Sequence, residues 1–180
     1  MLESSLKLIK CPNCNSKLNL EIYKNKEEID EGVLECEKCK LLFPIIDKIP
    51  IMIIDFKKYI SEHKILSGKL YKLASSNQIK KILKASLNNI CWNQIDKTKI
   101  EERWAQIYHT NKNNKFYKII KSHIESIPKS KLVLEYGCSI GIITNYMSKS
   151  SEKVFGIDKS FSAIHLAKKD QNNNLEYIVS

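Results

Sequence analysis

A short apolar run that ends in an acid and a glycine turn is the part of this sequence best suited to hold a small molecule. Residues 132–134 are the continuous apolar stretch expected of a parallel strand covered on both faces, and Glu135 follows at its carboxyl end. Gly137 and Gly141 can adopt positive φ and let a ligand approach the backbone. Residues 142–149 can then open a helix whose free N–H groups face the same site. Because open α/β sheets bind ligands at this strand end, the pattern predicts a ligand cradle.

A second strand with an acid at its end follows further along the chain. Residues 154–157 form this strand, and Asp158 ends it. An acid after the second strand of a Rossmann-like unit can accept hydrogen bonds from both hydroxyls of a ribose. Two acids at matching strand ends are more specific than either one alone. Asp158 is therefore our candidate for a ribose-binding residue.

The spacing of the acid and the small residues resembles motif I of the class I S-adenosylmethionine-dependent methyltransferases, in which an acid is followed by glycines at alternate positions. Asp158 matches the second acidic position of that family. The resemblance implies an S-adenosylmethionine site made of Glu135, Gly137, Cys138, Ser139, Gly141 and Asp158. Glu135 would orient the methionine end of the cofactor, and Asp158 would hold the ribose. Ser139 stands where the family usually has its middle glycine, a change that serine's small size makes tolerable.

Two other interpretations of this turn stay open. A dinucleotide site would need the spacing Gly-x-Gly-x-x-Gly, and therefore glycines at positions 139 and 142, where the chain has Ser139 and Ile142. The acid at Glu135 is also foreign to that pattern. The simplest alternative is that Gly137 and Gly141 only make a turn between a strand and a helix. The two acids at matching strand ends favour the methyl donor.

Four cysteines near the amino terminus form two Cys-x-x-Cys pairs, Cys11 with Cys14 and Cys36 with Cys39, with 21 residues between the pairs. This spacing is close to that of zinc ribbons in which four thiolates bind one tetrahedral Zn²⁺. A segment of about fifty residues buries little apolar area, so the metal would supply much of its folding free energy. With all four positions filled by sulfur, such a zinc has no open site for catalysis.

Disulfides or a redox pair would use the same cysteines differently. Disulfides need an oxidising compartment, yet the chain opens with Met-Leu-Glu-Ser and lacks the basic and apolar regions of a secretory signal. We therefore expect a cytoplasmic protein with reduced cysteines. A redox Cys-x-x-Cys would occur singly, so the doubled spacing favours zinc. Cys91 and Cys138 are lone thiols without a paired base, and we assign neither a nucleophilic role.

Residues 32–52, which contain the second cysteine pair, resemble the zinc-ribbon domain of the tRNA methyltransferase activator subunits. The resemblance covers residues 6–53, and its metal positions fall on Cys11, Cys14, Cys36 and Cys39. Lys48 stands where that family often has glycine. The domain occurs free as an activator and also fused ahead of methyltransferase domains. The resemblance thus implies either a methyltransferase partner that binds through the ribbon or a methyltransferase in the same chain.

The composition gives weaker signals about partners. The chain of 180 residues is 43% hydrophobic and has a formal net charge of +10, with ten lysines and three acids in residues 55–99. Arg103 is the only arginine, whereas bidentate phosphate recognition usually prefers arginine. We interpret the lysines as a solvated face and keep an RNA-binding module as an alternative. The most apolar stretch, residues 41–54, contains Asp47 and Lys48, so we expect no membrane span.

The remaining patterns predict helices and one further strand. Residues 56–110 look helical in patches, as in residues 79–87. A clearer helical stripe, ended by a proline, is formed by Phe116, Ile119, Ile120, His123, Ile124 and Ile127. The stripe resembles the lead-in helix that packs on the methyltransferase sheet and often helps to close the cofactor pocket, and we expect His123, on its apolar face, to lie in the core. Ser160 or Ser162 can cap a helix, and residues 175–179 have the pattern of a third strand.

These elements predict an α/β fold with an incomplete Rossmann-like methyltransferase sheet, preceded by a small β zinc ribbon and a helical connector. Residues 6–9 and 17–20 alternate like strands of the ribbon. The predicted domains are the ribbon at 1–55, a basic connector at 56–112, and the amino-terminal part of a methyltransferase domain at 113–180.

The predicted function is transfer of a methyl group from S-adenosylmethionine to an acceptor that the sequence does not identify. A methyltransferase sheet of this class has further strands that carry the substrate pocket, so we expect the 180 residues to be either a fragment or a truncated gene product, inactive alone. The alternative is a non-catalytic zinc-ribbon interaction or activator protein with a remnant half-Rossmann segment. Trp104, Tyr108 and His109 form either part of a cofactor lid or, more commonly for such residues, a helix packing face.

Overall fold

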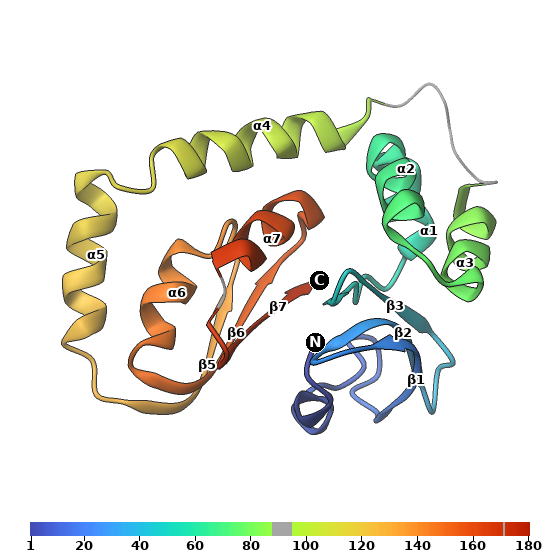
Figure 1. The fold of residues 1–180 in the computed structure, drawn as a ribbon, viewed down its shortest axis with the longest axis horizontal. Helices are drawn as coiled ribbons and strands as arrows, with labels where there is room; N and C mark the ends of the chain where they lie inside the picture. The colour runs from blue at the N-terminus through green and yellow to red at the C-terminus, as the bar shows by residue number, and fades with distance from the viewer. Residues whose placement is uncertain (88–94, 171) are drawn as a thin grey trace. The chain divides into compact units, whose positions relative to one another are not determined.

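The computed structural model describes residues 1–87, 95–170 and 172–180, and the chain divides into two compact units, Met1–Lys99 and Ile100–Ser180 (Figure 1). Our assignment for Cys91 falls outside the described residues. The predicted domain limits at positions 55 and 112 stay a prediction. Among the described helices, none combines the length and the apolar character needed to cross a membrane.

The first unit begins with a 3₁₀ helix, η1 (Glu3–Leu8), and continues into an antiparallel sheet of four strands in the order β1-β2-β3-β4. The strands are β1 (Leu18–Asn25), β2 (Ile29–Cys36), β3 (Leu42–Ile46) and β4 (Ile49–Pro50). The prediction of a strand near residues 17–20 is confirmed by β1, whereas the predicted strand at 6–9 is wrong. The chain there buries Met1, Ser5 and Ile9, every fourth residue, which suits a helical turn better than a strand.

Three helices complete the first unit: α1 (Phe56–Glu62), α2 (Lys64–Leu73) and α3 (Asn77–Leu87). Their helical character was predicted from the sequence and is confirmed. Although many of their lysines are exposed, the helices share a buried apolar face made of Ile60, Leu66, Leu70, Ile79 and Leu83. The region is therefore packed as part of the first unit.

A buried carboxylate joins the ribbon sheet to these helices. Glu31 on β2 is only 3% exposed, and it accepts hydrogen bonds from the backbone N–H and the hydroxyl of Ser75 and from the backbone N–H of Ser76. Burial raises the pKa of Glu31, but these hydrogen bonds outweigh burial and hold it below the ordinary range. The charge on Glu31 is thus stabilised by the turn that leads into α3.

The second unit is built on a parallel sheet in the order β5-β6-β7. Helices α4 (Lys97–Thr110) and α5 (Lys115–Glu125) precede it. The sheet unit runs through β5 (Ser130–Tyr136), α6 (Ile142–Ser148), β6 (Ser151–Asp158), α7 (Phe161–Ala167), the 3₁₀ turn η2 (Lys168–Asp170) and β7 (Leu175–Val179). Helices α6 and α7 cover the same face of the sheet (Figure 1). The predicted zinc ribbon followed by helices and a partial Rossmann-like sheet is confirmed.

Two details of the second unit differ from the predictions. Leu132 and Leu134 on β5 are 52% and 61% exposed, so this strand is not covered on both faces as expected. Helices α6 and α7 cover one face of the sheet (Figure 1), and Leu132 and Leu134 alternate onto the other face. The stripe of α5 is also mostly exposed, and its one buried residue is Ile124. His123 is exposed rather than in the core, although α5 does contact α6.

Candidate functional site

The four cysteines of the ribbon come together in two turns of matching geometry. The N–H of Cys11 donates to the carbonyl of Ser16, and the N–H of Asn15 donates to the carbonyl of Cys11. The second turn repeats both bonds, from Cys36 to the carbonyl of Leu41 and from Lys40 to the carbonyl of Cys36. Asn15 and Lys40, the residues after each second cysteine, have φ of 57° and 58°. Each turn therefore presents its two sulfurs in the same way.

The sulfur atoms of Cys11, Cys14, Cys36 and Cys39 all lie within 4.8 Å of one another. The Sγ atoms of Cys11 and Cys39 are 3.5 Å apart, far beyond the roughly 2.0 Å of a disulfide bond. Hydrogen bonds from Ser16 lower the pKa of Cys14 to about 6, while burial raises the pKa of Cys11 to about 12. Four convergent sulfurs, none of them in a disulfide, form a donor set that fits one tetrahedral Zn²⁺.

The strand ends of the second unit bring the predicted cofactor residues together. The turn after β5 is held against β6 by the N–H groups of Gly137 and Cys138, which donate to the carbonyl of Ile157 at 2.7 and 3.0 Å. Gly137, Ser139 and Gly141 all have positive φ, at 76°, 49° and 72°. The alternate spacing of small residues thus follows from a backbone that enters the left-handed region at every second residue. Serine is less suited than glycine to this conformation, so Ser139 carries local strain.

Asp158 connects this turn to the start of α7. Its Oδ2 accepts a hydrogen bond from the N–H of Ser139 at 2.8 Å, and its Oδ1 accepts from the N–H of Ser160 at 2.9 Å. The Ser160 hydroxyl in turn accepts from the N–H of Ala163, which confirms the predicted cap at Ser160. Since a carboxylate has about four acceptor positions, Asp158 retains capacity to accept further hydrogen bonds.

The two glycines of the turn have different surroundings. A Cβ atom on Gly137 would meet nothing within 4 Å, so the backbone there is open to a ligand. A Cβ atom on Gly141 would lie 2.1 Å from the hydroxyl of Tyr177, and one on Gly156 would lie 2.7 Å from the Tyr177 ring. We expected both turn glycines to admit a ligand, but Tyr177 occupies the space beside Gly141. The small residue at position 141 is explained by this packing as well as by its φ.

Glu135 lies at the end of β5, next to the first turn of α6. Its Oε2 accepts a hydrogen bond from the hydroxyl of Thr144 at 2.5 Å. Burial raises the pKa of Glu135, the nearby negative charge of Asp158 adds to this, and hydrogen bonds from Thr144 oppose it. Burial also raises the pKa of the Cys138 thiol, which keeps the thiol protonated at neutral pH. This agrees with giving Cys138 no nucleophilic role.

Sequence reasoning missed Tyr177 and Thr144. Tyr177 pairs with Gly156 across β6 and β7, so an aromatic residue opposite a glycine on the neighbouring strand was the available signal. Thr144 is the third residue of α6, where a hydroxyl can face the end of the preceding strand. Both residues are buried against the turn. They pack against the predicted site from the interior of the protein.

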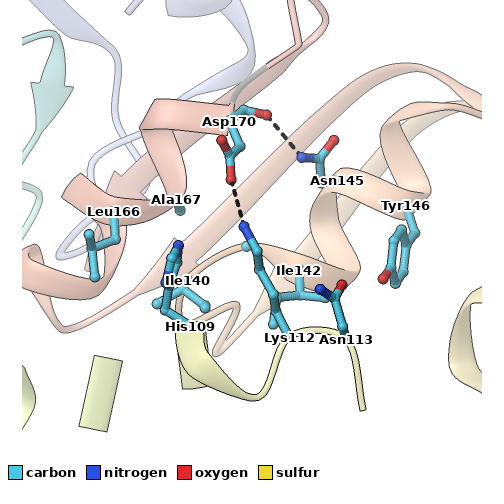
Figure 2. Close-up of a pocket in the computed structure, with 11 residues that line it drawn as sticks. His109, Lys112, Asn113, Ile140, Ile142, Asn145, Tyr146, Leu166, Ala167 and Asp170 are labelled. Atoms are coloured by element: carbon cyan, nitrogen blue, oxygen red, sulfur yellow. Dashed lines mark hydrogen bonds and ion pairs between the residues drawn. The ribbon is translucent and has the colours of Figure 1, made fainter. Parts of the chain in front are cut away.

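A small pocket of about 150 Å³ lies between the end of α4, α6 and α7 (Figure 2). His109, Lys112, Asn145 and Asp170 line it, and Lys112 pairs with Asp170 at 3.6 Å. It shares Gly141 with the predicted cofactor residues but none of the others. His109, one of the three residues considered for a lid, lines this pocket, whereas Trp104 and Tyr108 do not and are 55% and 41% exposed.

Comparison with known families identifies the amino-terminal segment. Residues 5–47 match the family model described as Trm112p-like protein. The matched segment contains all four cysteines of the cluster. The prediction of a zinc ribbon of the methyltransferase-activator type is thereby confirmed for this segment. No curated protein matches the chain.

Solved structures with similarity to the chain include several methyltransferases. One is a chain from a complex that contains the Haloferax volcanii Trm112 methyltransferase activator, with 15% identity and a TM-score of 0.39 over 44% of this chain and 38% of the other. Another is a TehB-like SAM-dependent methyltransferase from Corynebacterium glutamicum, with 26% identity and a TM-score of 0.37 over 44% of each chain. A third is magnesium protoporphyrin IX methyltransferase from Synechocystis with bound SAM, with 11% identity and a TM-score of 0.28 over 69% of this chain and 52% of the other. The chain thus spans about half or less of the length of these proteins.

Proposed function

We propose that this protein is an S-adenosylmethionine-dependent methyltransferase whose cofactor-binding half lies in the second unit and whose ribbon binds a structural zinc. The observation that carries the proposal is the contact between two strand ends. Glu135 and Asp158 lie at the carboxyl ends of neighbouring parallel strands, and the turn with alternating positive φ runs between them. Its Ser139 N–H is bonded to Asp158. Such strand ends are where open α/β sheets bind ligands.

The roles of the residues follow from their surroundings. Gly137 leaves the backbone open, so the cofactor would approach there. The Asp158 carboxylate has acceptor capacity beyond its two backbone bonds, which suits the two hydroxyls of a ribose. Glu135, when ionised, would attract the ammonium of a methionine moiety. S-adenosylmethionine supplies an electrophilic methyl group on its sulfonium, and the protein contributes by holding donor and acceptor in line.

Gly137 offers a test that separates ligand approach from backbone strain. Asparagine tolerates positive φ better than other residues with a side chain, so Gly137→Asn should retain the turn while placing a side chain over the open backbone. Saturation-transfer NMR on the whole chain detects weak binding. We expect S-adenosylmethionine to show saturation transfer with the wild type and not with Gly137→Asn. A wild type that responds to NAD and not to S-adenosylmethionine would refute the proposal.

A second candidate function is favoured by the match of residues 5–47 to Trm112p-like proteins. On this alternative the ribbon binds and activates a separate methyltransferase, and the strand ends of the second unit bind no cofactor. The same NMR experiment discriminates, because an activator would transfer no saturation to S-adenosylmethionine. A methyltransferase that gains activity when the chain is added would then support the activator function.

A further inference from the structure

Thr144 connects α6 to the strand before it. Its side chain is 0% exposed, and its hydroxyl donates to Oε2 of Glu135 at 2.5 Å. The backbone N–H of Thr144 also lowers the pKa of the same carboxylate. The N-cap residue of α6 is Gly141, which has no side chain to accept a bond from the first turn. The first turn of α6 is therefore connected to Glu135 by the Thr144 side chain rather than by a cap residue.

We propose that Thr144 is a positioning residue that holds the Glu135 carboxylate, through its hydroxyl, at the place where the cofactor would bind. The proposal rests on the proposed function of this site. It gives Thr144 a role that packing alone does not require, since a valine would fill the same volume without donating a hydrogen bond. By binding one side of the carboxylate, Thr144 fixes the direction in which Glu135 presents its charge.

The surroundings of Glu135 explain why such a donor matters. The titratable groups that interact with it from the elements packed around it are Asp158, Cys138, Tyr177 and Tyr117. None of these four is a cation. Burial and Asp158 favour the protonated carboxyl, and Thr144 favours the ionised form. Loss of the Thr144 hydroxyl should therefore let Glu135 take up a proton at a higher pH, and a neutral Glu135 attracts an ammonium group poorly.

Two variants separate the effect of the Thr144–Glu135 hydrogen bond from the effect of Thr144 packing. Thr144→Val keeps the shape and removes the donor, while Thr144→Ser keeps the donor and removes a methyl group. We would follow the carboxyl ¹³C resonance of Glu135 through a pH titration of the whole chain, with Glu135→Gln to assign the signal. The expected result is a raised Glu135 pKa in Thr144→Val and a pKa near the wild-type value in Thr144→Ser. Equal pKa values in all three proteins would overturn the proposal, and Thr144→Ala replaces the valine variant if that variant does not fold.

The pH dependence of cofactor binding is the second readout. With S-adenosylmethionine as the probe, we expect the pH below which saturation transfer is lost to move upward in Thr144→Val, and Thr144→Ser to restore it. An unchanged pH profile beside a changed Glu135 pKa would show that Thr144 does not act on the ligand, and the positioning role would be lost. If the wild type does not bind S-adenosylmethionine at any pH, the proposed function fails, and the positioning role toward that cofactor fails with it. The ¹³C titration still reports separately whether Thr144 controls Glu135.

Discussion

The backbone N–H of Ser139 donates a 2.8 Å hydrogen bond to Oδ2 of Asp158, and this bond joins the ends of two parallel strands. Ser139 has φ of 49°, a conformation in which a residue with a side chain is strained. A charge-assisted bond to its N–H helps to offset that strain. Asp158 thus has a structural role in the turn besides any role in binding a ribose, and both roles must be separated by experiment.

Asp158→Ala should weaken both the fold and the site. The change removes two hydrogen bonds to a charged group, each worth about 1.5–3 kcal/mol. We expect a lower free energy of unfolding in urea. On the proposed function we also expect S-adenosylmethionine to bind about ten- to a hundredfold more weakly in a saturation-transfer NMR titration.

Glu152→Ala is the matched control, because Glu152 is an exposed acid on the same strand. It should leave both quantities near their wild-type values. A full-affinity Asp158→Ala protein would show that the carboxylate does not hold the ribose. An unchanged urea midpoint would show that the bonds to Ser139 and Ser160 contribute little.

Replacement of the two turn glycines by alanine should have unequal effects. Gly137→Ala meets only the strain of positive φ, roughly 1 kcal/mol, because the space around it is open. Gly141→Ala meets the same strain and in addition a clash with the hydroxyl of Tyr177, for which overpacking costs about 1–3 kcal/mol more. Urea unfolding of both variants should therefore rank Gly141→Ala as the less stable protein.

Tyr177 provides the coupling test for this ranking. Combined with Gly141→Ala, a smaller side chain in Tyr177→Leu should relieve the clash, so the double variant should lose less stability than the sum of the two single changes. Gly137→Ala combined with Tyr177→Leu should be additive, because no part of Tyr177 lies within 4 Å of a Cβ at position 137. If the stability losses of Gly141→Ala and Tyr177→Leu are additive, the backbone at position 141 moves away from Tyr177 without a cost in the free energy of unfolding.

Local patterns in the sequence predicted the parts of the fold whose cause is local. The cysteine pairs, the cap at Ser160 and the acids at the ends of β5 and β6 are each set by a few neighbouring residues, and the structure places them as expected. Burial was harder to predict. The apolar run 132–134 indicated a strand correctly but not that Leu132 and Leu134 would be exposed, because the cover of a sheet face depends on segments far away in the chain.

In the candidate site, too, some features could be predicted from the local sequence and others could not. The residues of the turn could be found from their spacing, whereas Tyr177 lies 36 residues from Gly141 and its contact depends on the register of β6 and β7. The role of His123 was predicted wrongly for a related reason. An apolar helix face indicates which side can be buried, but the elements that pack against it decide how much of that side is covered, and in α5 only Ile124 is buried.

Removal of zinc should unfold the ribbon. If Cys11, Cys14, Cys36 and Cys39 bind one metal ion, binding free energy is folding free energy for this small sheet. We expect about one zinc per chain by elemental analysis and loss of ribbon amide dispersion in NMR spectra after chelation. Cys36→Ser should have the same effect without a chelator. Cys138→Ala, which changes a buried thiol in the other unit, should retain the zinc. Zinc-free protein that folds normally would refute the metal site.

Glu31 should make the first unit sensitive to acid. Its pKa in the folded protein lies below the ordinary glutamate value because of the bonds from Ser75 and Ser76. The unfolded chain therefore binds a proton more readily than the folded chain, and stability falls as the pH drops below the ordinary value of about 4.3. Above that value the contribution is fully present. Glu31→Gln should lower stability at neutral pH by roughly 1–3 kcal/mol and flatten its decline in acid.

Glu27→Gln is the control for this effect, since Glu27 is an exposed acid in the turn before the same strand. Thermal unfolding of the three proteins between neutral and acid pH checks the prediction. The wild type and Glu27→Gln should lose stability in parallel as the pH falls, and Glu31→Gln should approach them at the acid end, where the Glu31 carboxyl is protonated in the folded and unfolded states alike. A constant difference between Glu31→Gln and the wild type at every pH would show that the loss comes from packing. In that case the ionised carboxylate would not be what stabilises the turn before α3.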